Sequence, residues 1–445
     1  VFESFLPYGV RHVVIQHSGR RPVRIHSLRI RTANCGSRLQ GHFLSPDPLL
    51  NQIYQIAAQS VISGVDDTFT DCPTFEQVNW NFDNRTAWQG EIFTSANHAI
   101  ARHSIQLFAE DTEFPDLVRS QYPSGWRNLI PIYCFHWIMW CREYYRYSGD
   151  EALIRSIFQR IEKGIEKALG MINAQGLLEW RGDGWHFVEW GHGRDDNHPI
   201  NSAEQAAFVG ALEAAHDLGR RLGLAGDEQL QRWSLARQHL IEAVNHYLWD
   251  ADRQVYVDSL HADGARSLTS TQTTNAALAV YGIADADRRA MLAHKIASDD
   301  PALLPFGSPY GLYYVMELLD SVGDVESIFR HIRHRWGDMV RSGDGTTWEQ
   351  FAEFGGKENP TRSRCHPFAA YVIKYLVKYL LGIELLDEGY RRFHVRPRPP
   401  AFIDCCEGSI PTPHGRIRVR WDRHDGRINV SVEHPPGLER VTADQ

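Results

Sequence analysis

The sequence predicts a mainly α-helical fold, an (α/α)6 toroid with β-strands at both ends of the chain. Helical periodicity runs through most of the 445 residues, and period-2 alternation is confined to the first and last segments. The helices also alternate between apolar and charged ones. A helix that is apolar on most faces is buried on all sides, so this alternation indicates an inner ring wrapped by an outer ring.

Three zones follow from these patterns. Residues 1–44 are expected to contain β-strands, as the end of an N-terminal β-domain or as linker strands, because residues 12–16 and 27–31 alternate. Residues 45–382 form the predicted (α/α)6 catalytic domain, and residues 383–445 a small C-terminal β-sandwich domain. Val1 is not a methionine, which indicates a piece of a longer polypeptide.

The helices of the middle zone are assigned from their periodicity. Ser45-Pro46 supplies an N-cap and a first-turn proline for the first helix. Residues 131–147 are apolar on most faces and are expected inside, whereas residues 226–248 are charged and are expected outside. A generic helical array is the alternative, but no fixed repeat favours a solenoid. Further helices are expected at 86–108, 150–172, 201–222, 271–283, 286–299, 308–322, 324–336 and 365–381.

The last zone carries the pattern of a β-hairpin. Ile417, Val419 and Trp421 alternate with arginines, a second alternating run follows at 428–432, and Asp425-Gly426 lies between the two runs. An Asp-Gly pair between alternating runs is typical of a tight hairpin turn. We expect this hairpin to pack against the toroid together with the N-terminal strands.

Composition excludes several classes of partner. The net charge of −8 disfavours nucleic acid, whose phosphates require a basic surface. The sequence contains no apolar run long enough to span a membrane. Seven cysteines without a Cys-x-x-Cys pair favour reduced thiols over a disulfide framework. The 13 tryptophans and 17 tyrosines suit stacking on sugar rings, although a single tryptophan is more often a core residue. Compartment and oligomeric state stay open.

Two acidic segments carry the chemistry. Asp71, Glu76 and Asp83 lie within thirteen residues that also contain Trp80, and Glu349 follows Trp348 far downstream. Glycoside hydrolysis needs one carboxyl group that protonates the leaving oxygen and a second that activates water or attacks the sugar. The segments therefore predict a sugar-cleaving enzyme.

Glu76 is the candidate acid. It is expected in a loop between two helices, where most glutamates are merely solvated. Phe75 and Trp80 would exclude water from its carboxyl group and favour the protonated form that an acid needs. Asp71 and Asp83 would then accept hydrogen bonds from substrate hydroxyls, or would simply cap a helix.

Glu349 has two interpretations of similar weight. Thr346-Thr347-Trp348-Glu349 matches a helix capping box, in which Glu349 would bond back to Thr346. A glutamate at a helix N-terminus also stays ionised readily, as a general base must.

Residues 185–198 are rich in aromatic and polar side chains and are expected to line the funnel, with Trp190 against the sugar. The acids and histidines of this segment could suggest a metal, but they lack the His-x-x-x-His spacing and the EF-hand pattern. We therefore expect no metal and no cofactor.

The acidic segments resemble the motifs of glycoside hydrolase family 78, the α-L-rhamnosidases. The family pattern of Asp-Cys-Pro, Glu, Trp and Asp is similar to residues 71–83, and its Gly-x-Thr-Thr-x-Trp-Glu motif is similar to residues 343–349. A downstream histidine is matched by His366. The resemblance covers the helical zone and the C-terminal zone.

This resemblance implies an (α/α)6 catalytic domain with flanking β-sandwich parts and an inverting mechanism. Glu76 would be the general acid and Glu349 the general base, while Asp71, Asp83 and His366 would bind the sugar or tune the acid. Trp80, Trp190 and Trp348 are the candidate substrate-binding aromatics. The chain departs from the family at Phe75, where an arginine that helps to bind sugar hydroxyls is usual. The expected substrate is therefore a terminal α-L-rhamnose or a related sugar.

The hypothesis has three rivals. One is a retaining enzyme, since an inverting pair of carboxyl groups lies about 6.5–9.5 Å apart and a retaining pair about 5 Å apart. The second is a phosphorylase of another sugar on the same toroid, which would need no general base. The third is a catalytically weak or inactive carbohydrate-binding homologue.

Overall fold

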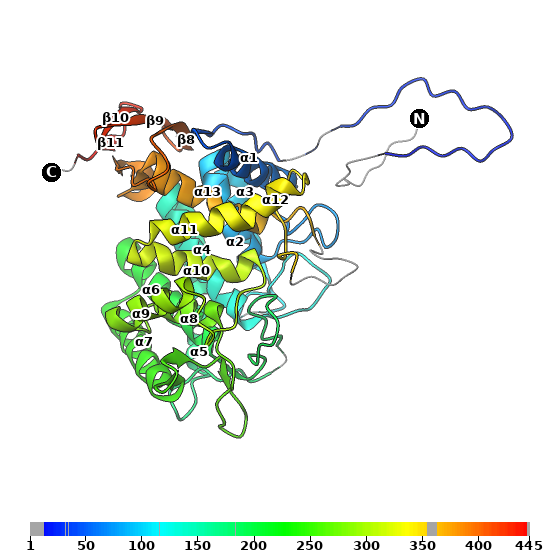
Figure 1. The fold of residues 1–445 in the computed structure, drawn as a ribbon. Coiled ribbons are helices and arrows are strands. Elements are labelled where there is room, and N and C mark those ends of the chain that lie inside the picture. The colour runs from blue at the N-terminus through cyan, green and yellow to red at the C-terminus, as the bar shows by residue number, and fades with distance from the viewer. Residues whose placement is uncertain are drawn as a thin grey trace.

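The computed structural model describes residues 13–31, 33, 35–114, 116–182, 184–353 and 363–442 of the chain. Figure 1 shows a body of stacked helices with the orange and red C-terminal strands at one end. None of the described helices is both long and apolar enough to cross a lipid bilayer.

Six helical units of the described chain form an inner ring. Each contacts the next along the sequence, and the last contacts the first, which closes the ring. Their side chains are buried along most of their length, as a helix inside a ring requires. The units are α2 (Asn81–Thr94), α4 (Pro131–Ser148), α6 (Ser202–Leu222), α8 (Gln272–Val280), α10 (Pro309–Val322) and the composite of η2 (Pro367–Tyr371), α13 (Val372–Tyr375) and η3 (Leu376–Leu381).

The other helices alternate with these along the chain and pack on their outer side. α7 buries only Trp233, Leu240, Ala243 and Val244, so a single stripe contacts the inner ring. The predicted alternation of buried and exposed helices is therefore confirmed. The outer helices are α1 (Pro48–Ser63), α3 (His98–Glu110), α5 (Glu151–Leu169), α7 (Asp227–Tyr247), α9 (Ala286–Ala297), and α11 (Val325–His331) continued by η1 (Ile332–Trp336) and α12 (Gly337–Arg341).

Two helix boundaries differ from the prediction. The first helix starts at Pro48 rather than Pro46, because Asp47 caps it by accepting the Leu49 N–H at 2.9 Å. The single helix expected at 86–108 is divided into α2 and α3, since Ala96 adopts a left-handed φ of 50° that a helix cannot continue through.

The described strands form two larger sheets and two short ladders. The predicted hairpin is confirmed: β9 (Gly415–His424) and β10 (Arg427–Glu433) pair in antiparallel register around Asp425-Gly426. The first sheet has the order β1-β8-β9-β10, and the second β11-β7-β6. The other strands are β1 (His42–Leu44), β8 (Cys405–Thr412), β6 (Ile383–Leu385), β7 (Arg392–Val395) and β11 (Glu439–Arg440); β2 (Ile200–Asn201) pairs with β5 (Ser259–Leu260), and β3 (Trp249–Asp250) with β4 (Val255–Tyr256). A short helix, η4 (Glu388–Tyr390), precedes β7.

The strands expected at 12–16 and 27–31 are absent from the described residues, and His12 lies outside them. This part of the prediction is wrong. Alternation alone does not make a strand, which also needs a partner edge, and Val14 and Ile30 are exposed in an extended segment that projects from the helical body (Figure 1). A strand that the sequence did not indicate, β1, pairs instead with β8 of the C-terminal sheet.

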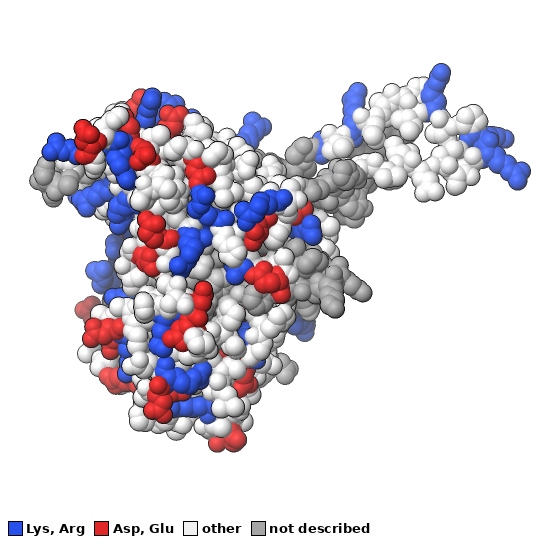
Figure 2. Space-filling view, in the orientation of Figure 1, with Lys and Arg blue, Asp and Glu red and all other residues white. Residues whose placement is uncertain are grey.

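The charged side chains are mixed on the visible surface of the helical body. On the face shown in Figure 2, Lys and Arg lie among Asp and Glu, and neither sign forms a continuous area there. All seven cysteines are free thiols.

Candidate active site

Several predicted site residues lie at the N-terminal ends of the inner helices, together with two tyrosines that the sequence did not single out. Trp80 directly precedes α2, His366 directly precedes η2, and Tyr133 and Tyr310 lie in the first turns of α4 and α10. Since the outer helices return the chain, the inner helices begin at the same end of the ring. Helix N-termini carry partial positive charge and favour carboxylates.

The acidic loop before α2 is closed by Asp71. Its Oδ1 accepts the Val78 N–H at 2.9 Å and its Oδ2 the Cys72 thiol at 2.7 Å, while the Asp71 N–H donates to the Val78 carbonyl. Burial raises the pKa of Asp71 to about 6, although the His366 charge and these hydrogen bonds act in the opposite direction. Asp71 therefore fixes the loop that presents Glu76.

Glu76 lies against Trp80, whose indole N–H donates to Oε2 at 2.7 Å. Trp80 is buried and meets Tyr133 and Trp126 edge-on, each at 5.8 Å between ring centroids. Phe75, in contrast, is 57% exposed, so the expectation that it excludes water from Glu76 is wrong. Its position before the acid on a surface turn directs the ring to solvent, and the indole is the aromatic partner of this carboxyl group.

Asp83 links the start of α2 to the two neighbouring units of the ring, α4 and η2. The Tyr133 hydroxyl donates to Oδ2 and the His366 Nε2 pairs with Oδ1, both at 3.1 Å. Burial alone would lower the pKa of His366, but the hydrogen bond to Asp83 and the charges of Glu349, Asp83 and Asp71 raise it to about 9. His366 is therefore a buried cation among carboxylates at neutral pH.

Glu349 lies at a bend in an irregular segment and not at a helix N-terminus, so the capping-box interpretation is wrong for the described residues. The segment runs beside the one that leads to His366: the His366 N–H donates to the Thr347 carbonyl at 2.8 Å, and the Glu349 N–H to the Ser363 carbonyl at 3.0 Å. The Ser363 N–H returns to Glu349 Oε2 at 3.2 Å. This pairing sets the buried Glu349 next to the His366 cation.

The turn before Glu349 depends on two glycines. Gly343 and Gly345 adopt φ values of 75° and 74°, which side-chain residues rarely adopt. Asp344 between them accepts the Trp348 indole N–H at 2.9 Å. Trp348 is buried, and its indole N–H stabilises this turn by donating to Asp344.

A continuous set of contacts links the two predicted catalytic glutamates, Glu76 and Glu349. It runs from Glu76 through Trp80 and Tyr133 to Asp83, then through His366 to the segment that carries Glu349. Tyr133 was missed from the sequence because its helix is apolar throughout, which indicated only a core position. Its only sequence signal was a hydroxyl in the first turn of an inner helix.

The segment 185–198 closes another side of the same end of the ring. Trp190 packs against Phe187 at 4.8 Å, and Phe187 contacts Tyr310 at 5.7 Å, which in turn stacks on Tyr133 at 6.2 Å. The rings of Phe187 and Tyr310 therefore lie between Trp190 and Tyr133. Its role as a sugar-stacking residue stays a prediction.

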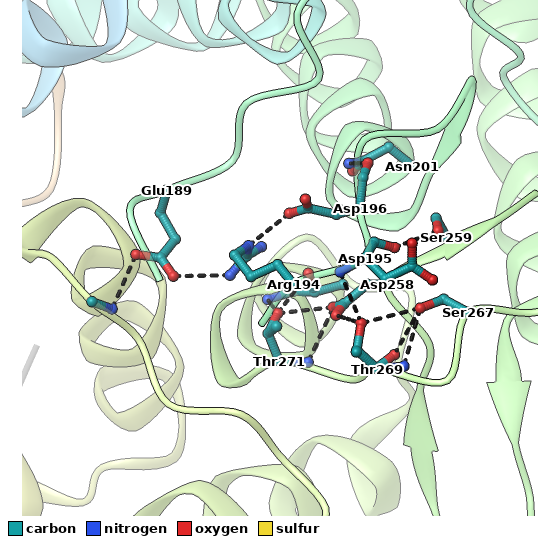
Figure 3. Close-up of polar contacts among 12 residues, drawn as sticks. Glu189, Arg194, Asp195, Asp196, Asn201, Asp258, Ser259, Ser267, Thr269 and Thr271 are labelled. Atoms are coloured by element: carbon teal, nitrogen blue, oxygen red, sulfur yellow. Dashed lines mark hydrogen bonds and ion pairs between the residues drawn. The ribbon is translucent and has the colours of Figure 1, made fainter. Parts of the chain in front are cut away.

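This segment also contains a buried ion pair that the sequence did not reveal. Glu189 accepts Arg194 at 2.9 Å through Oε1, and through Oε2 the Gly307 N–H and the Ser308 hydroxyl, both at 3.1 Å. Arg194 also donates to Asp196 at 2.7 Å, so it lies between two carboxylates (Figure 3). Both members of the Glu189–Arg194 pair are buried, and they anchor the segment to the start of α10.

Asp71, Cys72 and His366 bring donor atoms within 4.8 Å of one another, as metal ligands would. The Cys72 thiol already donates to Asp71, and the His366 Nε2 is engaged by Asp83. Burial and the Asp71 carboxylate raise the pKa of the Cys72 thiol to about 12, so the thiol stays protonated and is a weak ligand. The expectation that the catalytic site uses no cofactor stays a prediction.

Family models and known proteins agree with this architecture. The bacterial α-L-rhamnosidase six-hairpin glycosidase domain matches residues 38–380, and the bacterial α-L-rhamnosidase C-terminal domain matches residues 382–441. A curated α-L-rhamnosidase of Formosa agariphila is 20% identical over 424 residues, which are 89% of this chain and 43% of that protein. The chain thus spans less than half the length of this relative.

Solved structures have the same fold. A family 78 rhamnosidase of Bacillus sp. GL1 is 29% identical with a TM-score of 0.87, and the match covers 92% of this chain and 43% of that one. A Streptomyces avermitilis α-L-rhamnosidase, solved in complex with L-rhamnose, is 16% identical with a TM-score of 0.73 over 91% of this chain and 38% of its own. The six inner and six outer helical units are the hairpins of this fold. The chain belongs to the bacterial α-L-rhamnosidase family and carries its six-hairpin glycosidase domain and its C-terminal domain.

Proposed function

We propose that this chain provides the catalytic domain of an inverting exo-glycosidase that removes a terminal α-L-rhamnose or a related deoxy sugar. Glu76 is the general acid and Glu349 the general base. Family membership supports the reaction class, and the Streptomyces avermitilis relative was solved with L-rhamnose bound. The chain's own acidic pair supports the mechanism.

The observation that carries the proposal is the buried polar cluster around His366. Its Nε2 is engaged by Asp83, whereas its Nδ1 has no hydrogen-bond partner within the described ranges. A buried donor without a partner costs free energy, and a sugar hydroxyl would satisfy it. The positive charge of His366 also interacts with the carboxylates of Glu349 and Asp71. Both carboxylates are therefore close to the His366 ring, where the sugar hydroxyl would bind.

The chemistry then follows from two proton transfers. Glu76 gives its proton to the glycosidic oxygen as the bond from that oxygen to the anomeric carbon breaks, and the Trp80 indole holds the carboxylate that remains. Glu349 removes a proton from a water that attacks the anomeric carbon from the opposite face. After the reaction Glu76 is ionised and Glu349 is protonated. Proton exchange with solvent returns both glutamates to their starting states.

Hydrolysis of a chromogenic α-L-rhamnoside tests this proposal. We expect Glu76→Gln and Glu349→Gln each to lose about 10²-fold or more of kcat, the range for general acid or base help. Leu235→Gln, an exposed position on α7, is the matched control and should keep wild-type turnover. Undiminished hydrolysis in either glutamine variant would refute its assigned role.

The stereochemistry and the sugar are tested separately. Proton NMR of the first product should show the anomer opposite to that of the substrate, and retention would exclude inversion. A panel of α-L-rhamnosides and related deoxy and uronic glycosides, assayed with wild type and Phe75→Arg, defines the sugar. If rhamnosides stay intact with wild type but are cleaved by Phe75→Arg, the residue before the acid sets the specificity.

A further inference from the structure

We propose that Asp195, His198 and His261 form a binding site for a divalent first-row metal ion, with Zn²⁺ as the expected occupant. Two imidazoles and one carboxylate bring their ligand atoms within 4.8 Å of one another. None of the three belongs to the hydrolytic site described above. The site therefore goes beyond the proposed hydrolysis and does not depend on it.

Strand pairing brings the two histidines together from distant parts of the chain. β2 and β5 are antiparallel, with Ile200 opposite Leu260 and Asn201 opposite Ser259. His198 precedes β2 and His261 follows β5, so this register places them at the same end of the ladder. Their rings stack with centroids 4.0 Å apart and planes 22° apart.

Both histidines direct the same ring nitrogen at the same carboxylate. His198 Nε2 lies 2.8 Å from Asp195 Oδ1, and His261 Nε2 lies 2.8 Å from Asp195 Oδ2. Ligand atoms of a tetrahedral zinc ion are about 3.3 Å apart, since each bond is about 2.0 Å long. Each Nε2–carboxylate pair would therefore need to widen by about half an ångström to accept such an ion.

The backbone around Asp195 is fixed independently of its side chain. Its N–H donates to the Thr269 hydroxyl at 3.1 Å and its carbonyl accepts the Ser259 hydroxyl at 2.6 Å, as Figure 3 shows. The turn after β5 is held in the same way, since the His261 N–H donates to the Ala265 carbonyl at 2.9 Å. Ligands on a rigid backbone lose little freedom on binding, which favours affinity.

The surroundings favour a cation. Arg194 interacts with the carboxyl groups of Glu189, Asp196 and Asp258. A dication at Asp195 would be attracted by these acidic groups. Arg194 is already paired with two of these groups. The ligand side chains are about one-third exposed, which leaves a path for the ion and room for water as a fourth ligand. These acidic residues are visible around Arg194 in Figure 3.

The donor set selects the class of metal. Imidazole suits Zn²⁺, Cu²⁺ and Ni²⁺, whereas Ca²⁺ and Mg²⁺ prefer all-oxygen sites. Zn²⁺ at this position would join the segment that carries Trp190 to the β5 turn. The expected role is to hold that wall of the funnel, and its readout is metal binding and thermal stability rather than turnover.

The test is a calorimetric titration of the chain with Zn²⁺ after removal of metals by a chelator and of any affinity tag. We expect one saturable site per chain and a rise in Tm on loading. Asp195→Asn, His198→Ala and His261→Ala should each weaken binding by at least about 10-fold, the usual effect of disturbing a metal shell. His239→Ala, an exposed histidine on α7, is the matched control and should bind like wild type.

Two results would overturn the inference. One is the absence of a saturable site in the wild type. The other is a site that persists in all three ligand variants, which would place the ion elsewhere. Should the alanine variants fail to fold by circular dichroism, Co²⁺ loading of the wild type decides: intense visible bands of four- or five-coordination support the site, and the weak spectrum of octahedral Co²⁺ excludes it.

Discussion

The charge of His366 gives the most quantitative prediction. This imidazole is buried, and its pKa rises from 6.5 to about 9. A rise of this size corresponds to about 3 kcal/mol of stabilisation of the folded state, because one pKa unit is worth about 1.4 kcal/mol. The folded pKa lies above the unfolded one, so the stabilisation is complete below pH 6.5 and disappears as the pH rises through 9.

The perturbation is His366→Gln, and the assay is urea unfolding followed by tryptophan fluorescence. The difference in unfolding free energy between wild type and variant should shrink by about 2 kcal/mol between about pH 7.5 and pH 9.5. Titrating groups that do not interact with His366 are shared by the two proteins and cancel in this difference. The KM of the wild type for rhamnoside is expected to rise over the same range if His366 Nδ1 binds a sugar hydroxyl.

His98→Gln is the matched control. Burial lowers the pKa of His98 to about 4, so this histidine is neutral above pH 7.5 and its variant should show a difference that does not change with pH. An equally constant difference for His366→Gln would refute the reasoning, since it would mean that His366 is neutral beside Asp83.

Two further predictions concern the neighbours of the acids. Trp80→Phe keeps an aromatic ring but removes the indole N–H that donates to Glu76. A hydrogen bond to a charged group is worth about 1.5–3 kcal/mol, so kcat should fall by about 10-fold or more. An unchanged kcat would show that the indole does not stabilise the Glu76 carboxylate. Arg194→Met leaves the buried Glu189 without its cation and should lower the urea-unfolding free energy by about 3–5 kcal/mol. Adding Glu189→Gln to Arg194→Met should restore part of that loss, and strictly additive effects would contradict a direct pair.

The sequence was most informative where the signal is local. Helix positions and the register of the β9–β10 hairpin follow from periodicity and turn residues within one segment, so most predicted helices agree with the structure to within a few residues. Asp71, Glu76 and Asp83 were predicted as site residues in the same way, because one segment of thirteen residues carries all three. The domain boundaries stay predictions.

The sequence failed where a segment's state depends on a distant partner. Residues 27–31 alternate like a strand but form no strand within the part of the chain that the structure describes. The segment ending at Glu349 matches a capping box, yet it pairs with the chain before His366, and that pairing replaces the helix. In both cases the local pattern allows two conformations of similar free energy, and the partner chooses between them.

The sequence by itself predicted the helical ring, the C-terminal β9–β10 hairpin and the candidate catalytic residues Glu76 and Glu349, since these depend on patterns within a few residues. Only the tertiary structure decided that Glu76 and Glu349 are joined through Asp83 and His366, and that His261 completes a ligand set with Asp195 and His198. His261 directly follows β5 and is more than sixty residues from Asp195 along the chain. Spacing along the sequence does not predict these contacts. They arise when the helical ring closes and β2 pairs with β5, because burial and backbone hydrogen bonds fix these segments relative to one another.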